Sequence, residues 1–231
     1  MKTGTHKIRI AGEWDIQDLY IFPYRYSQLY SFLYALSTVK NPKDNLFVEA
    51  SERPPWEGGF STVNFYREIY RLIPEEERPQ IKRMEYASPG FIEISAVVLI
   101  VTQIDRILTT AFSSWNKLDA IYDEIEKRRK KRQKEKFKVK EMERKAKEED
   151  VKFAVKICKE LSEALGLENS EQLNKLNSDE IVRLKILLTF YRRLEPLLFF
   201  IKEQKLNLKG ISEEQIKDAK HGGREFEFGD D

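Results

Sequence analysis

The feature that most constrains the fold of this chain is the stretch 102–165, which contains neither proline nor glycine. Across its start, apolar residues recur at alternating steps of three and four, the spacing of a heptad seam on one side of a helix. This pattern predicts a long helical segment whose seam packs against another helix. The predicted helix-interface residues are Val101, Ile104, Leu108, Ala111, Trp115, Leu118, Tyr122 and Ile125.

The seam stops at Glu126, and a strongly basic run occupies 127–140. This run holds ten Lys or Arg residues against one acid, so its formal charge is +9, whereas the whole chain is only +2. Segregated positive charge binds phosphate groups through counterion release, although a solvated charge run is the commoner explanation. The candidate nucleic-acid or anion-binding residues are Lys127, Arg128, Arg129, Lys130, Lys131, Arg132, Lys134, Lys136, Lys138 and Lys140.

Two arrangements fit the stretch 102–165. One continuous helix would extend for roughly 90 Å and would need a partner along it. Alternatively, two antiparallel helices meet at a break within 127–140, which gives a coiled-coil hairpin with a basic tip. Because no turn residue lies in that interval, we prefer the extended, partly solvated arm.

Residues 1–100 predict a small α+β domain. Residues 7–11 alternate polar and apolar, as a half-buried strand does. Asp15 is a candidate N-cap for a short helix that ends before Pro23, and a second helix follows over 24–38. A third helix is expected from Ser61 or Thr62 to about Ile73. A strand is also expected at 46–50, and 53–60 is expected to be a loop because of its prolines and glycines.

A β-hairpin is predicted around Ser88-Pro89-Gly90, because Pro-Gly fits the centre of a type II turn. The β-branched residues of 91–101 favour a strand after this turn, although Ser88-Pro89 is also a typical helix start. The expected core face of the hairpin consists of Ile81, Ala87, Ile92, Ile94, Ala96 and Val98.

Three tyrosines, Tyr26, Tyr30 and Tyr34, recur every four residues in the predicted helix 24–38. Such a ladder could stack nucleic-acid bases or bind a partner. We favour a core position for the ladder, with buried rings and hydroxyl groups in water.

After The segment 182–201 is apolar nearly all round and must be buried, against the arm or in an oligomer interface. Ser212 is expected to cap a last short helix. The predicted class is therefore α+β, mainly α: domain 1–100, helical arm 101–166, C-terminal helices 167–220 and a tail 221–231.

The residue inventory leaves little room for catalysis. The two histidines, His6 and His221, lie near the ends of the sequence, which argues against most metal sites and Ser/His or Cys/His catalysis. Cys158 is the single cysteine and is expected to be buried and unreactive. Carboxylates near Trp14, and Glu85 with Glu93, are better explained by capping and cross-strand pairing than by acid–base chemistry. We therefore expect no cofactor and no enzymatic activity.

Location and partners follow from the same composition. The segment 1–10 lacks the apolar core of a signal peptide, and the apolar run 91–101 is too short to span a bilayer. We therefore expect a cytoplasmic protein and no membrane contact. The preferred hypothesis is an interaction or scaffold protein that assembles through helical packing, as a homo-oligomer or with a helical partner. The alternative is a nucleic-acid-binding protein that uses 127–140. The third is an enzyme with a site at 58–62.

Overall fold

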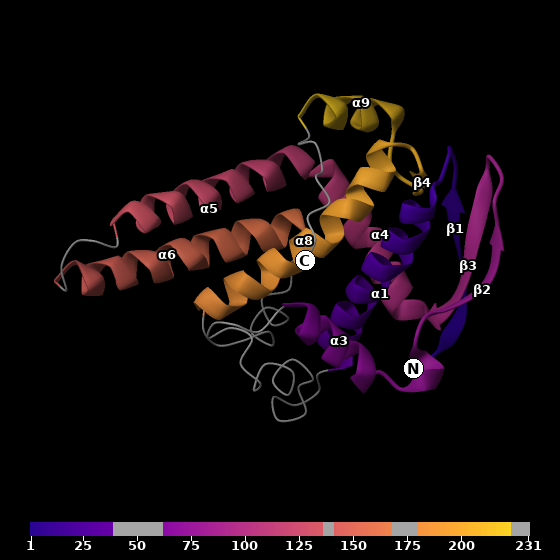
Figure 1. Cartoon of the computed structure of the whole chain (residues 1–231), viewed down its shortest axis with the longest axis horizontal. Coiled ribbons are helices and arrows are strands. Elements are labelled where there is room, and N and C mark those ends of the chain that lie inside the picture. Colours follow the sequence, from indigo (N-terminus) through magenta and orange to yellow (C-terminus); the bar gives the residue numbers. More distant parts are fainter. Residues whose placement is uncertain (39–61, 136–140, 168–179, 223–231) are drawn as a thin grey trace.

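The computed structural model describes residues 1–38, 62–135, 141–167 and 180–222. Figure 1 shows a helical body with a sheet on one side and a two-helix arm on the other. The predicted class, mainly α with a small antiparallel sheet, is confirmed. The strands are β1 (Thr3–Ile10), β2 (Gln80–Glu85), β3 (Gly90–Val97) and β4 (Leu206–Asn207). The described helices are α1 (Ile16–Thr38), α3 (Thr62–Leu72), α4 (Val98–Ser113), α5 (Trp115–Glu135), α6 (Glu141–Ala164), α8 (Glu180–Lys202) and α9 (Glu213–Gly222).

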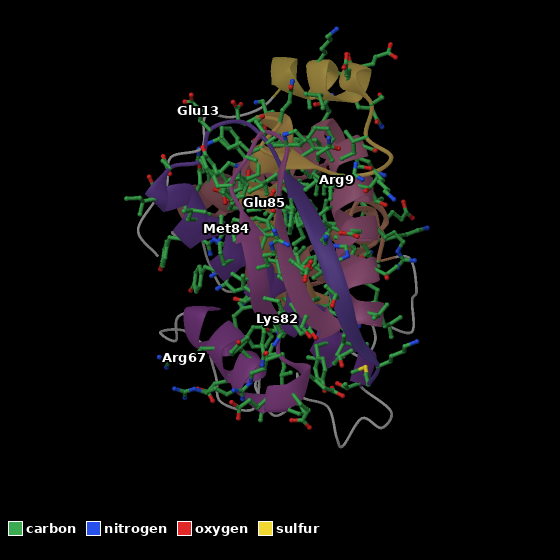
Figure 2. All side chains as sticks on the ribbon, turned by 90° about the vertical axis from the view of Figure 1, so that its right-hand side faces the viewer. Arg9, Glu13, Arg67, Lys82, Met84 and Glu85 are labelled. Carbon is green, nitrogen blue, oxygen red and sulfur yellow. The ribbon has the colours of Figure 1, made fainter. Side chains whose placement is uncertain are left out.

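The sheet has the order β2-β3-β1-β4, and all three neighbouring pairs are antiparallel. β1 and β2 therefore run in the same direction on either side of β3, which is the split β-α-β arrangement. The helical layer covers one face (Figure 1), where Ile8, Ile10, Ile92 and Ile94 are buried. The other face carries polar side chains and is turned to the viewer in Figure 2.

The predicted β2–β3 hairpin is confirmed, but its connection differs from the prediction. Gly90 is not a turn residue, because it is the first residue of β3 and pairs with Ile10. A Cβ atom at this position would lie 2.4 Å from the carbonyl oxygen of Glu85. Glycine is therefore required here by close backbone approach rather than by a type II turn.

The predicted strand 91–101 is too long, because α4 begins at Val98. The last pair between β1 and β3 joins Thr3 to Val97, so no strand remains to pair with the residues that follow. The predicted core face is also only partly right. Ile92, Ile94 and Ala96 are buried, whereas Ile81 in the edge strand and Val98 in α4 are exposed.

The two helices predicted on either side of Pro23 form one helix, α1. A proline inside a helix removes one backbone hydrogen bond, and burial of Phe22 and Tyr26 on either side of it offsets this loss. The predicted N-cap is confirmed. Asp15 Oδ1 accepts a hydrogen bond from the Asp18 N–H at 2.7 Å, and Asp18 Oδ2 accepts one from the Asp15 N–H at 3.1 Å.

The tyrosine ladder of α1 belongs to the core, and Tyr26, Tyr30 and Tyr34 are all buried. The expectation of hydrated hydroxyl groups is wrong. The Tyr30 hydroxyl donates to the Glu77 carbonyl oxygen at 2.6 Å and accepts from the Val97 N–H at 3.0 Å. The Tyr34 hydroxyl donates to the Glu77 carboxylate. These rings therefore fix α1 to the sheet and are not available to stack bases.

The heptad seam is divided between two helices, because α4 ends at Ser113 and α5 begins at Trp115. Serine competes for helical hydrogen bonds, and the Ser113 hydroxyl donates to the Thr109 carbonyl oxygen at 3.0 Å. The seam residues from Val101 to Leu118 are buried, and Tyr122 and Ile125 pack at the edge of the same core. This chain's own helices α1, α6 and α8 cover the seam.

A single core joins the segments that the sequence analysis divides. Its buried residues come from β1, α1, α4, α6 and α8, and β4 returns from the C-terminal part to pair with β1. α8 runs through Pro196 as one helix. The predicted N-cap at Ser212 is confirmed, since its Oγ accepts a hydrogen bond from the Gln215 N–H at 3.2 Å. The predictions for 39–61 and 223–231 lie outside the described residues.

Candidate functional site

The two-helix arm in Figure 1 is an antiparallel hairpin of α5 and α6. The preferred interpretation, one extended helix, is therefore wrong, and the hairpin alternative is correct. Ion pairs step along the two helices in opposite directions. Lys117 lies 3.8 Å from Glu163, and Glu124 lies 3.4 Å from Lys156. Exposed pairs of this kind contribute about 0–1 kcal/mol each, so apolar packing must hold the base of the hairpin.

That packing comes from the seam of α5, the inner face of α6 and the side of α8. Leu118 and Ile121 of α5 and Ile157 of α6 are buried in the common core. The rings of Tyr122 in α5 and Tyr191 in α8 lie 6.1 Å apart. The hairpin is therefore fixed to the body along its proximal half.

Arg128 makes the most distal contact between α5 and α6 among the described residues. Its guanidinium carbon lies 4.2 Å from the centroid of the Phe153 ring, and its Nη2 donates to the Glu149 carbonyl oxygen at 3.3 Å. A cation over an aromatic ring contributes roughly 0.5–2 kcal/mol. Near this contact, Lys127 and Lys130 are exposed.

The basic run therefore lies at the far end of the hairpin, on the opposite side of the molecule from the sheet (Figure 1). Because α5 continues to Glu135, the run occupies the last turns of this helix. The helix carries Lys127, Arg128, Arg129, Lys130, Lys131, Arg132 and Lys134. The other three predicted residues, Lys136, Lys138 and Lys140, lie outside the described residues.

Sequence analysis missed a cluster of ionisable groups where α5 meets α8. The Tyr191 hydroxyl donates to Asp119 Oδ1 at 3.3 Å. Burial, together with the nearby Asp119 carboxylate, raises the pKa of Glu195 to about 7, and Arg192 opposes this shift. Burial also raises the pKa of Tyr191 well above its ordinary value. The cluster places a carboxyl group that titrates near neutral pH at the base of the hairpin.

The carboxylates singled out near Trp14 have structural partners. Besides its capping role, Asp18 accepts a hydrogen bond from Lys205 Nζ at 2.5 Å. A cavity of about 170 Å³ lies beside this pair and is lined by Pro196 and Phe199, among others. A second cavity of about 190 Å³ lies between α1 and α3 and is lined mainly by tyrosine and serine. The capping and ion-pair geometry accounts for both aspartates.

Glu85 and Glu93 take the cross-strand and solvent positions expected for them. Glu85 lies 2.9 Å from Arg83, and Glu93 lies 3.5 Å from Lys7 on the open face of the sheet. Lys7 also lies over the ring of Phe91, with its Nζ 4.6 Å from the ring centroid. These pairs are solvent-exposed and give no sign of a shared proton or metal.

The remaining candidates for chemistry are also explained by packing. Cys158 is buried, and burial raises the pKa of its thiol to about 11, so it stays protonated and unreactive. His6 lies 3.5 Å from Asp105 across β1 and α4, a contact that the sequence spacing does not reveal. Within the described ranges, no three His, Cys, Asp or Glu side chains gather as metal ligands would.

Comparison with protein-family models, with curated proteins and with solved structures finds no match to this chain. Each helix in the described part of the chain is too short or too polar to cross a bilayer. The candidate site is therefore argued from its geometry and charge alone.

Proposed function

We propose that this protein is a non-enzymatic binding protein that contacts the phosphate groups of nucleic acid through the distal end of the α5–α6 hairpin. The observation that supports this proposal is the position of the run 127–140. It begins where the apolar contacts of α5 end, at the far end of an arm that projects from the body (Figure 1). Charge that neither fills the core nor lies near the sheet is free to meet a polyanion.

A rigid arm gives such a run more reach than a charge cluster on a compact surface. The helix presents its cations at a fixed distance from the acidic remainder of the chain, which carries a formal charge of −7. Separation from this negative charge reduces its screening effect, because exposed charges more than about 10 Å apart interact weakly at physiological salt. Such binding would be electrostatic and largely independent of base sequence.

The competing hypothesis was assembly through helical packing. Its main supports were an unpaired seam and a surplus apolar helix at 182–201. In the described residues, the seam packs inside the chain and α8 is buried against α1, α4 and α6. The need for a helical partner along the arm is therefore removed, and the basic run is left as the feature that needs an explanation.

Fluorescence anisotropy of labelled duplex DNA and RNA, measured against salt concentration, tests the proposal. The decisive variant changes Lys127, Arg129, Lys130, Lys131, Arg132 and Lys134 to Gln. It keeps Arg128, which packs on Phe153. If six phosphates are contacted, the wild-type affinity falls about 1,000-fold between 50 and 200 mM salt. The variant should lose nearly all of this salt-dependent binding.

A matched control separates local charge from net charge. It changes six exposed lysines outside the arm tip to Gln, namely Lys2, Lys7, Lys117, Lys159, Lys209 and Lys217. We expect this control to bind nearly as well as wild type. Equal loss in both variants, or no wild-type binding at low salt, would contradict the proposal.

A further inference from the structure

Six large apolar side chains are exposed on one side of the molecule, along the first turns of α1 and the edge strand β2. Several are more than half exposed, with Ile16 at 87%, Tyr20 at 68% and Tyr86 at 60%. Isolated exposed apolar residues are normal, but a contiguous group marks a binding surface. We call this group the α1–β2 surface, and it consists of Ile16, Leu19, Tyr20, Ile81, Met84 and Tyr86.

The two halves of the α1–β2 surface lie next to each other. The Tyr86 hydroxyl accepts a hydrogen bond from the Trp14 N–H at 3.2 Å, which holds the end of β2 against the start of α1. Figure 2 shows the first turns of α1, in indigo, beside Met84. All six residues of β2 are exposed, because this strand lies at the sheet edge.

Charged residues lie at the two ends of this surface. In Figure 2, Glu13 and Glu85 lie above Met84, whereas Lys82 and Arg67 lie below it. All four charged residues are exposed. A rotation of 180° about an axis through Met84 would bring the acidic end of one copy against the basic end of another. Surfaces of this kind are self-complementary, as two-fold symmetric dimer interfaces require.

We propose that a second copy of this chain covers the α1–β2 surface in a two-fold symmetric dimer, with Met84 near the axis. The composition supports this occupant, since tyrosine and methionine are enriched at the centres of protein interfaces and charged residues at their rims. Side-chain packing provides the contact. Continuous pairing of β2 edges is disfavoured, because the bulge between Ile81 and Arg83 interrupts the strand.

Sedimentation equilibrium of the full chain, over a roughly hundred-fold range of concentration, tests the apolar centre. We expect a monomer–dimer equilibrium in the wild type. Met84→Glu should weaken the dissociation constant by at least about ten-fold. The matched control is Val155→Glu, at a 49% exposed position on α6 outside this surface, and it should leave the constant unchanged. A monomeric wild type, or equal effects of both variants, would overturn the proposal.

A charge-exchange experiment tests the symmetry. One variant carries Lys82→Glu and Arg67→Glu, so both ends of its surface are acidic. The other carries Glu13→Lys and Glu85→Lys, so both ends are basic. Each variant alone should dimerise roughly five-fold more weakly than wild type, whereas an equimolar mixture should form a heterodimer at wild-type strength. Circular dichroism checks that both variants fold. No recovery in the mixture would overturn the two-fold arrangement, and this readout does not depend on nucleic-acid binding.

Discussion

Gly90 shows how a single position controls the hairpin at the sheet edge. A methyl group there would meet the backbone of Glu85 and Ala87, which cannot move away without breaking the pairing of β2 with β3. We predict that Gly90→Ala lowers the free energy of unfolding by about 1–3 kcal/mol, as measured by urea denaturation. Gly4→Ala is the control, because its methyl group meets the exposed side-chain end of Val98, which can rotate. Equal losses would show that backbone crowding is not the cause.

Two helices end in the same hydrogen-bonded motif with different residues at the left-handed position. After α6, Gly166 has φ of 70° and the Leu167 N–H donates to the Ser162 carbonyl oxygen at 2.8 Å. After α8, Gln204 takes the equivalent place with φ of 59°. Glycine is preferred in this position because a Cβ atom is strained there.

We therefore predict that Gln204→Gly raises the free energy of unfolding by about 1 kcal/mol, whereas Gly166→Ala lowers it by a similar amount or more. Thermal and urea denaturation measure both changes. Gly166 has a second reason to be glycine, because an added Cβ would lie 3.3 Å from Thr110. A destabilised Gln204→Gly protein would indicate that the Gln204 side chain stabilises the fold through its own contacts.

At the scale of elements, the contact of α5 with α8 makes stability depend on pH. The pKa of Glu195 is about 7 in the folded chain, against an ordinary value of 4.5. The folded state therefore favours the protonated carboxyl, and stability falls as pH rises from about 4.5 through 7. Above this range, the ionised group remains partly buried near Asp119 and costs roughly 1–3 kcal/mol after allowance for its partial exposure.

We predict that Glu195→Gln stabilises the protein by this amount at pH 8 and by much less at pH 5. Urea denaturation at the two pH values measures the difference. Glu203→Gln is the control, because Glu203 is exposed just beyond the end of the same helix. The assignment fails if both substitutions change stability equally at pH 8, or if the Glu195→Gln effect is the same at both values.

Sequence patterns predicted the elements whose causes are local. The N-caps at Asp15 and Ser212 depend on residues within one turn, and the seam from Val101 follows from helical spacing alone. Patterns failed where a distant partner decides. Val98 looks like a strand residue, but its N–H donates to Lys2, so the strand ends where β1 does. Pro23 looks like a helix boundary, but tertiary burial keeps α1 intact.

The candidate site was predictable in composition but not in placement. The run 127–140 is visible from charge, yet its position at the end of a hairpin depends on contacts such as Arg128 with Phe153. No spacing rule brings Glu195 to Asp119, because their meeting depends on how α8 packs against α5. The direction of the chain after α5 was undecided for the same reason, since both arrangements satisfy the same seam.

At the scale of the whole molecule, the arm and the body are expected to be energetically separable. The common core takes its last contributions along the arm from Ile125 of α5 and Phe153 of α6. Beyond them, the described side chains of Lys127, Lys130 and Val151 are exposed. Exposed residues away from caps and packing contacts usually change stability by less than about 0.5 kcal/mol. The distal arm should therefore contribute little to folding.

We predict that replacing 130–151 by a short Gly-Ser linker leaves the free energy of unfolding within about 1 kcal/mol of wild type. The linker keeps Arg128 and Phe153, so the last described contact between the helices survives. Because a longer flexible loop costs only about 0.6 kcal/mol per doubling of length, the new connection should not strain the fold. The same protein should lose salt-dependent nucleic-acid binding while its dimerisation through the α1–β2 surface is unchanged. If the shortened protein is strongly destabilised, the basic run is part of the folding unit, and its charge is then better explained by contacts within the chain than by a polyanion.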